Sequence, residues 1–156
     1  MFAVGHMALA YLLGKATAKL LKVQINIPLI LILSVIPDID LLYDFILKTA
    51  IHRGPTHSIL LATLVFIPLF IFYRQKAVPY FTALISHSLI ADLLIGGEVQ
   101  LLWPLSTTRF GLHALGFPYI DNYNPINITL ELTLFAIALL VMLKTRDLQH
   151  LFGTTS

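Results

Sequence analysis

Two acids and two histidines stand close together in a chain that is otherwise strongly apolar. They lie in the stretches Pro37-Asp38-Ile39-Asp40 and His52-Arg53-Gly54-Pro55-Thr56-His57-Ser58. Placing an ionisable side chain at membrane depth costs about 2.5–3.5 kcal/mol, and those that persist there usually face a polar cavity or bind something. Carboxylate oxygens and imidazole nitrogens bind divalent metals. These stretches are therefore predicted to supply half of a metal site, and helices before and after them to supply the rest.

The predicted ligands are three histidines and three aspartates, a set that suits zinc, manganese or iron and is large enough for two or more ions. They are His6, Asp38, Asp40, His57, His87 and Asp92. The chain has no cysteine, so only nitrogen and oxygen ligands are available. Alternatives stay open: a helix cap and a solvated turn for the acids, and polar bridges between helices for the histidines. Asp44 is left out, because an ion pair with Lys48 explains it.

Four residues within or beside this set are predicted to be catalytic. They are Asp40, His52, Arg53 and Glu131. A metal would lower the pKa of its bound water toward neutrality while one carboxylate acts as base. Arg53 would steady a phosphate, with a lipid headgroup as the alternative. His52 would orient a ligand or assist the leaving group, unless it is an ordinary loop histidine. For Glu131, helix packing in the protonated state is an equal alternative.

Composition indicates the class of protein in which this chemistry sits. Hydrophobic residues make up 58% of the 156 residues and charged residues only 12%, where a soluble domain carries about 25% charged residues. The chain is therefore predicted to be an integral membrane protein with an all-α helix bundle. Each transmembrane helix takes about 20 residues, so the length allows a single domain over 1–156. The net charge of +2 and the lack of a basic stripe exclude a nucleic-acid partner.

About five transmembrane helices must position the polar residues, and they are predicted at 2–21, 25–47, 57–73, 77–95 and 125–143. The first either spans the membrane or lies in its interface, because lysines share one stripe near its end. Pro37 breaks the second helix near its far end. The break lets Asp38 and Asp40 point into one cavity. The stretch 98–124 is predicted to be a re-entrant or surface segment.

The cations divide unevenly between the two ends of these helices. If the first helix spans, seven of the ten collect on one face, namely Lys15, Lys19, Lys22, Arg74, Lys76, Lys144 and Arg146. The other three, Lys48, Arg53 and Arg109, collect on the opposite face. The positive-inside rule then predicts a multi-pass protein with its N-terminus outside and its C-terminus in the cytoplasm. The predicted metal ligands fall toward the outer ends of their helices.

The same residues carry a resemblance to a known family. The chain resembles the YdjM-like family of LexA-regulated, inner-membrane proteins that are predicted to be metal-dependent hydrolases. The matching pieces, over about residues 5 to 110, are Gly5-His6 with Gly14, Pro37-Asp38-Ile39-Asp40, 52–58, Ser86-His87 to Asp92, and Gly97 through Leu101-Leu102-Trp103-Pro104 to Arg109-Phe110. The family is considered remotely similar to zinc-dependent phospholipase C and the P1-type nucleases. The resemblance therefore implies phosphoester hydrolysis, with zinc as the expected cofactor.

Two departures from the family pattern bear on the site. The family usually has three residues between the histidine and the aspartate of the fourth helix, whereas four residues separate His87 from Asp92. In an α-helix these two side chains would diverge by about 140°, unless a π-bulge restores the register. Ser88 stands where the usual spacing would put the histidine. Leu41 stands where many members carry a histidine directly after the acidic pair, so one potential ligand is missing.

Together these observations predict a hydrolase of the inner membrane that acts on a phosphoester of a lipid or lipid-linked substrate at the outer face. Its partners would be membrane lipids. A divalent-cation transporter or channel is one alternative, which the apolar cytoplasmic halves of the helices disfavour. A catalytically inactive scaffold with a structural metal is another, which the two departures favour. Activity with intact metal binding would exclude the scaffold.

Overall fold

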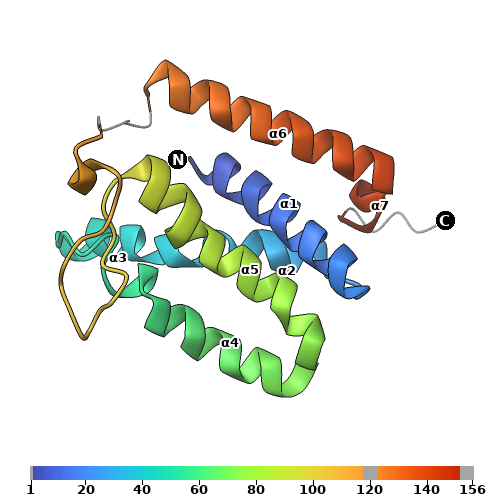
Figure 1. Cartoon of the computed structure of the whole chain (residues 1–156), viewed down its shortest axis with the longest axis horizontal. Coiled ribbons are helices and arrows are strands. Elements are labelled where there is room, and N and C mark those ends of the chain that lie inside the picture. The colour runs from blue at the N-terminus through green and yellow to red at the C-terminus, as the bar shows by residue number, and fades with distance from the viewer. Residues whose placement is uncertain (1, 118–122, 152–156) are drawn as a thin grey trace.

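The computed structural model describes residues 2–117 and 123–151, whose regular structure is helical apart from one isolated antiparallel bridge between Val99 and Phe110. The α-helices are α1 (Ala3–Leu21), α2 (Ile27–Leu33), α3 (Ile39–Leu47), α4 (Ile59–Tyr73), α5 (Val78–Ser86), α6 (Pro125–Thr145) and α7 (Asp147–Leu151) (Figure 1). Shorter 3-10 turns occupy Ile36–Asp38, Pro55–His57, Arg74–Ala77 and His113–Leu115, and a π-helical segment, His87–Gly96, continues α5. The predicted all-α class is confirmed. Residues 118–122 of the predicted segment 98–124 lie outside the described ranges.

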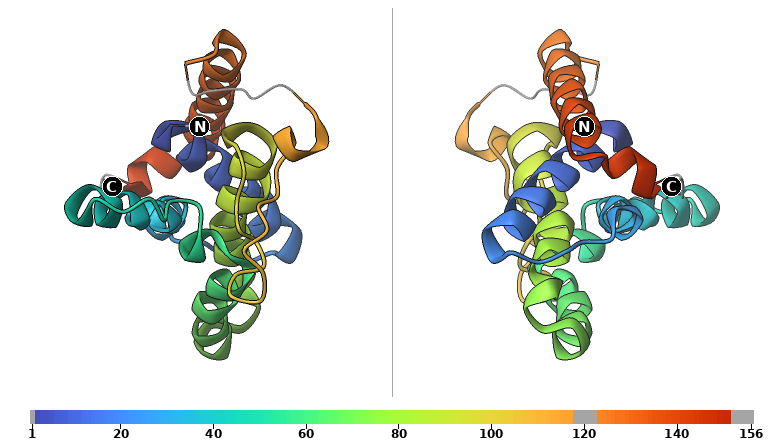
Figure 2. Two further views of the ribbon diagram at one scale, coloured as in Figure 1. Left: turned by 90° about the vertical axis from the view of Figure 1, so that its left-hand side faces the viewer. Right: turned by 90° about the vertical axis from the view of Figure 1, so that its right-hand side faces the viewer.

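Helix α1 is the central element of the bundle. It packs against α2, α5 and α6. Seen from either end, α3, α4 and α6 form three corners around α1, α2 and α5 (Figure 2). Small residues permit the close approach that holds helices together in lipid. A Cβ added to Gly14 would lie 2.8 Å from Cδ1 of Ile30 and 3.4 Å from the carbonyl oxygen of Pro79. An apolar core cluster fills the space between α1, α2 and α5, and its buried members are Ala10, Ile30, Leu33, Tyr80 and Ala83.

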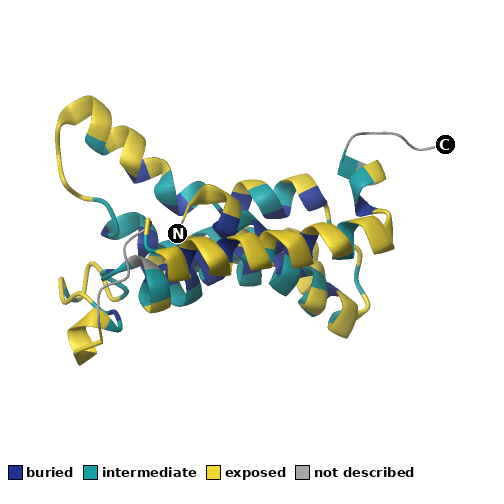
Figure 3. Cartoon of the chain, turned by 90° about the horizontal axis from the view of Figure 1, so that it is seen from above, coloured by how far each residue is buried: buried dark blue, intermediate teal, exposed yellow. Residues whose placement is uncertain are grey.

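The outward faces of the long helices are apolar and exposed (Figure 3). Two helical segments are long and apolar enough to cross a membrane, Ile59–Ile95 and Pro125–Thr145. In an apolar 18-residue stretch of each segment, only 6% and 22% of the residues, in that order, are buried inside the protein. The first segment contains the turn at Arg74–Ala77, so it consists of α4 followed by α5 and the π-helical segment. An apolar exterior around buried polar groups is the pattern of a protein whose solvent is lipid.

The second predicted span is broken where Pro37 predicts. Helix α2 ends at Leu33, and the chain resumes as α3 after the 3-10 turn. Helix α3 projects from the bundle, with Asp40 as its one buried residue (Figure 3). Asp38 occupies the N-cap position of α3, but its side chain makes no capping hydrogen bond. A capping role for Asp38 is therefore wrong, and its carboxylate is available to a site.

The connections between helices gather at two ends of the bundle. The α1–α2 loop, the turn Arg74–Ala77 and the α6–α7 junction lie at one end (Figure 1). Helix α3 and the loops 48–58 and 97–112 lie at the other end. The first three connections and the helix ends beside them carry the seven cations that were predicted to share one face.

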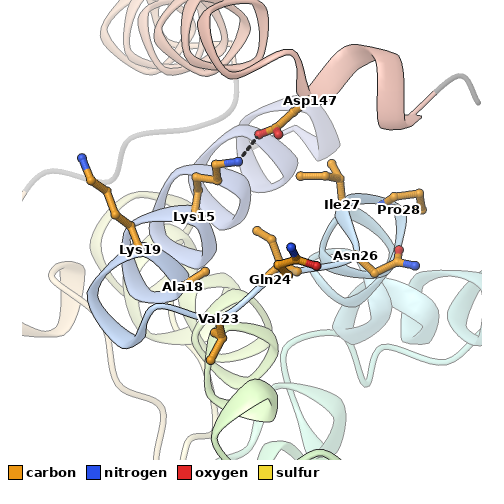
Figure 4. Close-up of a pocket in the computed structure, with 10 residues that line it drawn as sticks. Lys15, Ala18, Lys19, Val23, Gln24, Asn26, Ile27, Pro28 and Asp147 are labelled. Carbon is orange, nitrogen blue, oxygen red and sulfur yellow. Dashed lines mark hydrogen bonds and ion pairs between the residues drawn. The ribbon is translucent and has the colours of Figure 1, made fainter. Parts of the chain in front are cut away.

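Helix α7 folds back against α1 at the cation-rich end. The hydroxyl of Tyr11 donates a hydrogen bond to Oδ2 of Asp147 at 2.7 Å, and Lys15 pairs with the same oxygen beside a cavity of 720 Å³ (Figure 4). Burial opposes ionisation of Asp147, but the hydrogen bonds from Lys15 and Tyr11 outweigh it and lower the pKa of the carboxyl. The ionised form of Asp147 therefore stabilises the folded state.

Asp147→Asn is expected to lower the free energy of unfolding by about 1–2 kcal/mol at pH 7, because Tyr11 and Lys15 lose a charged acceptor. A lowered pKa gives stability that is present above the unfolded value of about 3.9 and is lost as the pH falls below it. The difference between parent and variant should thus shrink at pH 3. Thermal unfolding in uncharged detergent measures both values. Gln149→Ala, an exposed change on the same helix, is the control, and equal stabilities of parent and Asp147→Asn at pH 7 would contradict the prediction.

Candidate metal centre

At the end of the bundle opposite α7, the structure brings together the six residues that were predicted to bind metal. They are His6 of α1, Asp38 and Asp40 at the start of α3, His57 before α4, and His87 and Asp92 of the π-helical segment. All are buried except Asp38, whose side chain is 24% exposed. Buried ionisable groups are stable only when they are paired or bind a metal, so their contacts with one another decide what the site can do.

Two carboxylate oxygens converge on a pair of histidine nitrogens at the centre of the cluster. Nε2 of His57 lies 3.2 Å from Nε2 of His87. Oδ1 of Asp38 lies 3.5 and 3.3 Å from these two nitrogens, in that order. Oδ2 of Asp92 lies 3.2 and 3.3 Å from them. Ligand atoms held about 2.0–2.1 Å from one tetrahedral zinc ion stand about 3.3–3.4 Å apart, which is close to these five distances. We call the four atoms the tetrahedral ligand group.

Hydrogen bonds behind the two histidines orient their Nε2 lone pairs into the tetrahedral ligand group. Nδ1 of His87 lies 2.6 Å from the backbone carbonyl oxygen of Ser34, which can only accept, so Nδ1 carries the proton. The hydroxyl of Thr56 donates to Asp40 and therefore accepts from Nδ1 of His57 at 3.0 Å. Both Nε2 atoms are then acceptors that face each other, an arrangement that a shared cation stabilises.

His6 lies against the face of His87 rather than within the tetrahedral ligand group. The two rings are stacked, with centroids 3.8 Å apart and planes inclined by 14°. Nδ1 of His6 and Oδ2 of Asp92 are buried and have no hydrogen-bond partner among the described residues. Such an atom costs about 1–3 kcal/mol, and metal coordination would offset that cost. The donor set therefore fits a metal on the evidence of its own unsatisfied atoms.

Two further groups of three residues adjoin the tetrahedral ligand group, and their ligand atoms lie within 4.8 Å of one another. They are His6 with His87 and Asp92, and Asp40 with His52 and His57. Each shares at least one histidine with the tetrahedral ligand group. The buried cluster is thus continuous, and its size is consistent with the expectation of room for two or more ions.

The π-helical segment brings His87 and Asp92 onto one face despite the four residues between them. Hydrogen bonds in a π-helix run from residue i to i+5, so Asp92 lies one turn above His87 instead of 140° around the helix. The result is the 3.3 Å approach between Nε2 of His87 and Oδ2 of Asp92. The π-bulge that the sequence requires for a shared face is present, and it extends over His87–Gly96.

Asp40 lies behind His57 and joins several groups of the loop. Its Oδ1 lies 2.9 Å from Nδ1 of His52. Its Oδ2 accepts hydrogen bonds from the backbone N–H of Arg53 at 3.2 Å and from the hydroxyl of Thr56. The same oxygen lies 3.4 Å from Nδ1 of His57. Asp40 was predicted to be both a ligand and a base, and these contacts show that it orients the two histidines.

The remaining catalytic candidates occupy different places. Arg53 is at the site: its Nη2 lies 3.4 Å from Oδ1 of Asp92, and its backbone has a φ of 63°, in the left-handed region that non-glycine residues seldom adopt. Glu131, on α6, accepts a hydrogen bond from the backbone N–H of Phe2 at 2.9 Å. It therefore holds the N-terminal end of α1 and is not a member of the three ligand groups.

Three residues that support the site were not singled out from the sequence: Ser34, Thr56 and Asp44. Asp44 accepts hydrogen bonds from the hydroxyl of Thr49 and from the backbone N–H groups of Ile51 and His52, at 2.6–2.9 Å. The ion pair with Lys48 is therefore not what explains Asp44. Its position one turn after Asp40 on α3 was an available signal, since residues four apart share a helix face. The carbonyl of Ser34 leaves no such signal.

The fold and the cluster define a class of protein: a membrane-embedded helix bundle with buried histidines and aspartates that are able to hold a metal ion. The family model of the YdjM inner membrane protein matches residues 1–151. The chain belongs to this family. The match confirms the resemblance seen in the motifs and extends it over α6. No curated protein and no solved structure matches the chain.

Proposed function

We propose that this protein is a metal-dependent hydrolase of the inner membrane that cleaves a phosphoester of a lipid or lipid-linked substrate. The observation that carries the proposal is the tetrahedral ligand group. The Nε2 atoms of His57 and His87 lie 3.2 Å apart, and one oxygen each of Asp38 and Asp92 lies 3.2–3.5 Å from both. A bound divalent ion, with zinc preferred for this nitrogen and oxygen donor set, supplies an acidified water and neutralises charge on the phosphoester.

The residues around the centre divide the other tasks. Asp38 is the most exposed ligand, with 24% of its side chain accessible, so the substrate reaches the centre from its side. Asp40 accepts the proton on Nδ1 of His52 in a hydrogen bond, so Nε2 of that ring would take a proton from the attacking water and pass it to the leaving oxygen. Arg53 binds the phosphoryl oxygens, because its guanidinium already lies beside Asp92 at the edge of the centre.

The arrangement of the helices supports five crossings with the centre near the outer surface. The crossings are α1, α2 with α3, α4, α5 with the π-helical segment, and α6. Helix α1 is about 28 Å long at 1.5 Å per residue, which is close to the hydrocarbon thickness of about 30 Å, and its central place favours a span over an interfacial helix. The cation-rich end then faces the cytoplasm, and the metal centre faces outward at headgroup depth, where a lipid phosphoester would meet it.

The structure favours hydrolysis over transport of the ion. The apolar core cluster of Ala10, Ile30, Leu33, Tyr80 and Ala83 lies on the cytoplasmic side of the centre in this topology. A transit path for a divalent cation needs polar groups along the whole route. The grouped metal-ligand candidates lie at the other end of the bundle from Asp147, and the apolar core cluster separates the two ends, which suits a site that an external substrate visits.

The test is elemental analysis of the full chain in uncharged detergent, together with an assay of phosphoester cleavage on phospholipids and lipid phosphates. We expect stoichiometric zinc or manganese, and cleavage that stops on chelation and returns with added zinc. Asp92→Asn should lose both properties. Ser86→Ala, a buried change on α5 whose hydroxyl donates to the carbonyl of Ala83, should keep both. A parent that stays metal-free after incubation with zinc and manganese would overturn the proposal, and bound metal without cleavage of any such substrate would favour the scaffold.

A further inference from the structure

A cavity of 510 Å³ adjoins the metal centre at the loop end of the bundle. Its lining residues are His52, Arg53, Gly97, Glu98, Arg109 and His113. Two arginines and two histidines thus face a single carboxylate. The volume exceeds what one phosphate group fills, since a water molecule takes about 30 Å³ and a phosphate replaces only a few waters.

The cavity shares a wall with the metal centre. Arg53 lines the cavity, and its Nη2 lies 3.4 Å from Oδ1 of Asp92. His52 also lines it, and its Nδ1 lies 2.9 Å from Oδ1 of Asp40. Nε of Arg53 is buried without a hydrogen-bond partner in the described part of the chain. A substrate group bound at the centre would therefore have the cavity on the other side of Arg53.

Backbone hydrogen bonds build the far wall and fix Arg109 in it. Val99 and Phe110 exchange backbone hydrogen bonds of 2.8 and 2.9 Å, and the N–H of Gln100 donates to the carbonyl of Arg53 at 2.9 Å. Nη1 of Arg109 donates to the backbone carbonyl of Glu98 at 3.3 Å. Packing is tight here, because a Cβ added to Gly111 would lie 2.5 Å from the carbonyl oxygen of Gly97. The bridge between Val99 and Phe110 is thus joined to loop 48–58, and Arg53 and Arg109 line the same cavity.

The charges of the lining favour an anionic ligand. Asp92, which balances Arg53, is a ligand of the proposed metal, and its charge is then shared with the ion. The guanidiniums of Arg53 and Arg109 are left opposite Glu98 alone, with two imidazoles as further donors. Guanidinium groups pair well with phosphate and carboxylate oxygens. Arg53 is used by the scissile phosphoester, whereas Arg109 has no task in the proposed reaction.

We propose that this cavity is a subsite for a second anionic group of the substrate, next to the scissile phosphoester, with Arg109 as its specificity-determining residue. The inference rests on the proposed function and narrows it. The substrate class becomes a phosphoester with a neighbouring phosphate or carboxylate, as in a diphosphate or an acidic headgroup. Substrates with one anionic group would bind through the metal and Arg53 only.

The test compares three ligands that cannot be hydrolysed, titrated into the zinc-saturated full chain in uncharged detergent. Methylphosphonate has one anionic group, phosphonoacetate adds a carboxylate, and methylenediphosphonate adds a second phosphonate. We expect at least one of the two probes with a second anionic group to bind about tenfold more tightly than methylphosphonate. Arg109→Gln should reduce this advantage to less than about threefold and leave the affinity for methylphosphonate unchanged. The probe with the larger advantage identifies the second group as a phosphate or a carboxylate.

Lys48→Gln is the matched control, because it removes another cation from the same end of the protein outside the cavity lining. It should keep the full advantage. Equal binding of all three probes by the parent, failure of all three to bind, or an advantage that survives Arg109→Gln would each overturn the subsite. Zinc is measured in every sample before and after titration. A protein that binds zinc and cleaves a phosphoester but shows no advantage refutes the subsite alone, whereas absence of zinc refutes the proposed function itself.

Discussion

His57→Ala is expected to lower the zinc affinity of the purified protein by about 10²–10³-fold. Its Nε2 is one of the four atoms of the tetrahedral ligand group, and the ring also belongs to the group formed with Asp40 and His52. Zinc binding at four-ligand structural sites is worth about 10–16 kcal/mol. One quarter of that, about 2.5–4 kcal/mol, corresponds to this change in affinity. Competition with a chromogenic chelator measures it.

The control for His57→Ala is a second histidine at the same end of the protein. His113→Ala removes an exposed imidazole whose Nδ1 lies 3.2 Å from the carbonyl of Phe117. It should leave zinc affinity within about twofold of the parent. A His57→Ala protein that folds, as judged by its thermal unfolding, and still binds zinc with parental affinity would show that the tetrahedral ligand group is not the metal site.

Asp40→Asn is expected to weaken zinc binding by about 10–100-fold, which is the usual effect of removing the partner of a ligating histidine. The carboxylate accepts from the backbone N–H of Arg53 and from Thr56, and it lies 2.9–3.4 Å from Nδ1 of His52 and of His57. An asparagine presents an NH₂ group to one of these donors. The proton of His57 is then no longer held at Nδ1, and the lone pair at Nε2 is partly lost.

Asp44→Asn is the control that distinguishes an effect of Asp40 on the orientation of His57 from an effect on the stability of loop 48–58. Asp44 lies one turn further along α3 and accepts three hydrogen bonds from Thr49, Ile51 and His52 without contacting His57. Both variants should lower the unfolding temperature, because each removes a carboxylate that holds the loop. Only Asp40→Asn should weaken zinc binding by tenfold or more. Equal losses of affinity in the two variants would mean that Asp40 acts only by holding the loop.

The sequence predicts which polar residues cluster in this protein, because ionisable side chains are costly in an apolar chain. All six predicted ligands lie in three overlapping groups of residues, and all but Asp38 are buried. Pro37 also predicts the break before α3 correctly, since proline disfavours helical geometry in the residue before it. The cost of burying ionisable side chains and the break at Pro37 together account for the gathering of these residues in three overlapping groups.

The partners behind the ligands are not predictable in the same way. The carbonyl of Ser34 orients His87 across a separation of 53 residues, and any residue type supplies a carbonyl. Asp38 and Asp40 look alike in the sequence. Yet Asp38 contacts the Nε2 atoms of His57 and His87, whereas Asp40 contacts the Nδ1 atoms of His52 and His57 from behind. Glu131 was a candidate because it interrupts an apolar helix, but its contact with the N–H of Phe2 depends on how α6 packs on α1.

The π-helical segment has a consequence for how this centre arises in related chains. A single extra residue between two anchored ligands has two outcomes: it turns the second ligand away, or it is absorbed as a wider turn. Here the ends are anchored by Ser34 on His87 and by Arg53 beside Asp92, and the wider turn results. The wider turn therefore keeps both side chains on one face, so a search for such sites that assumes the spacing of an α-helix would miss this chain.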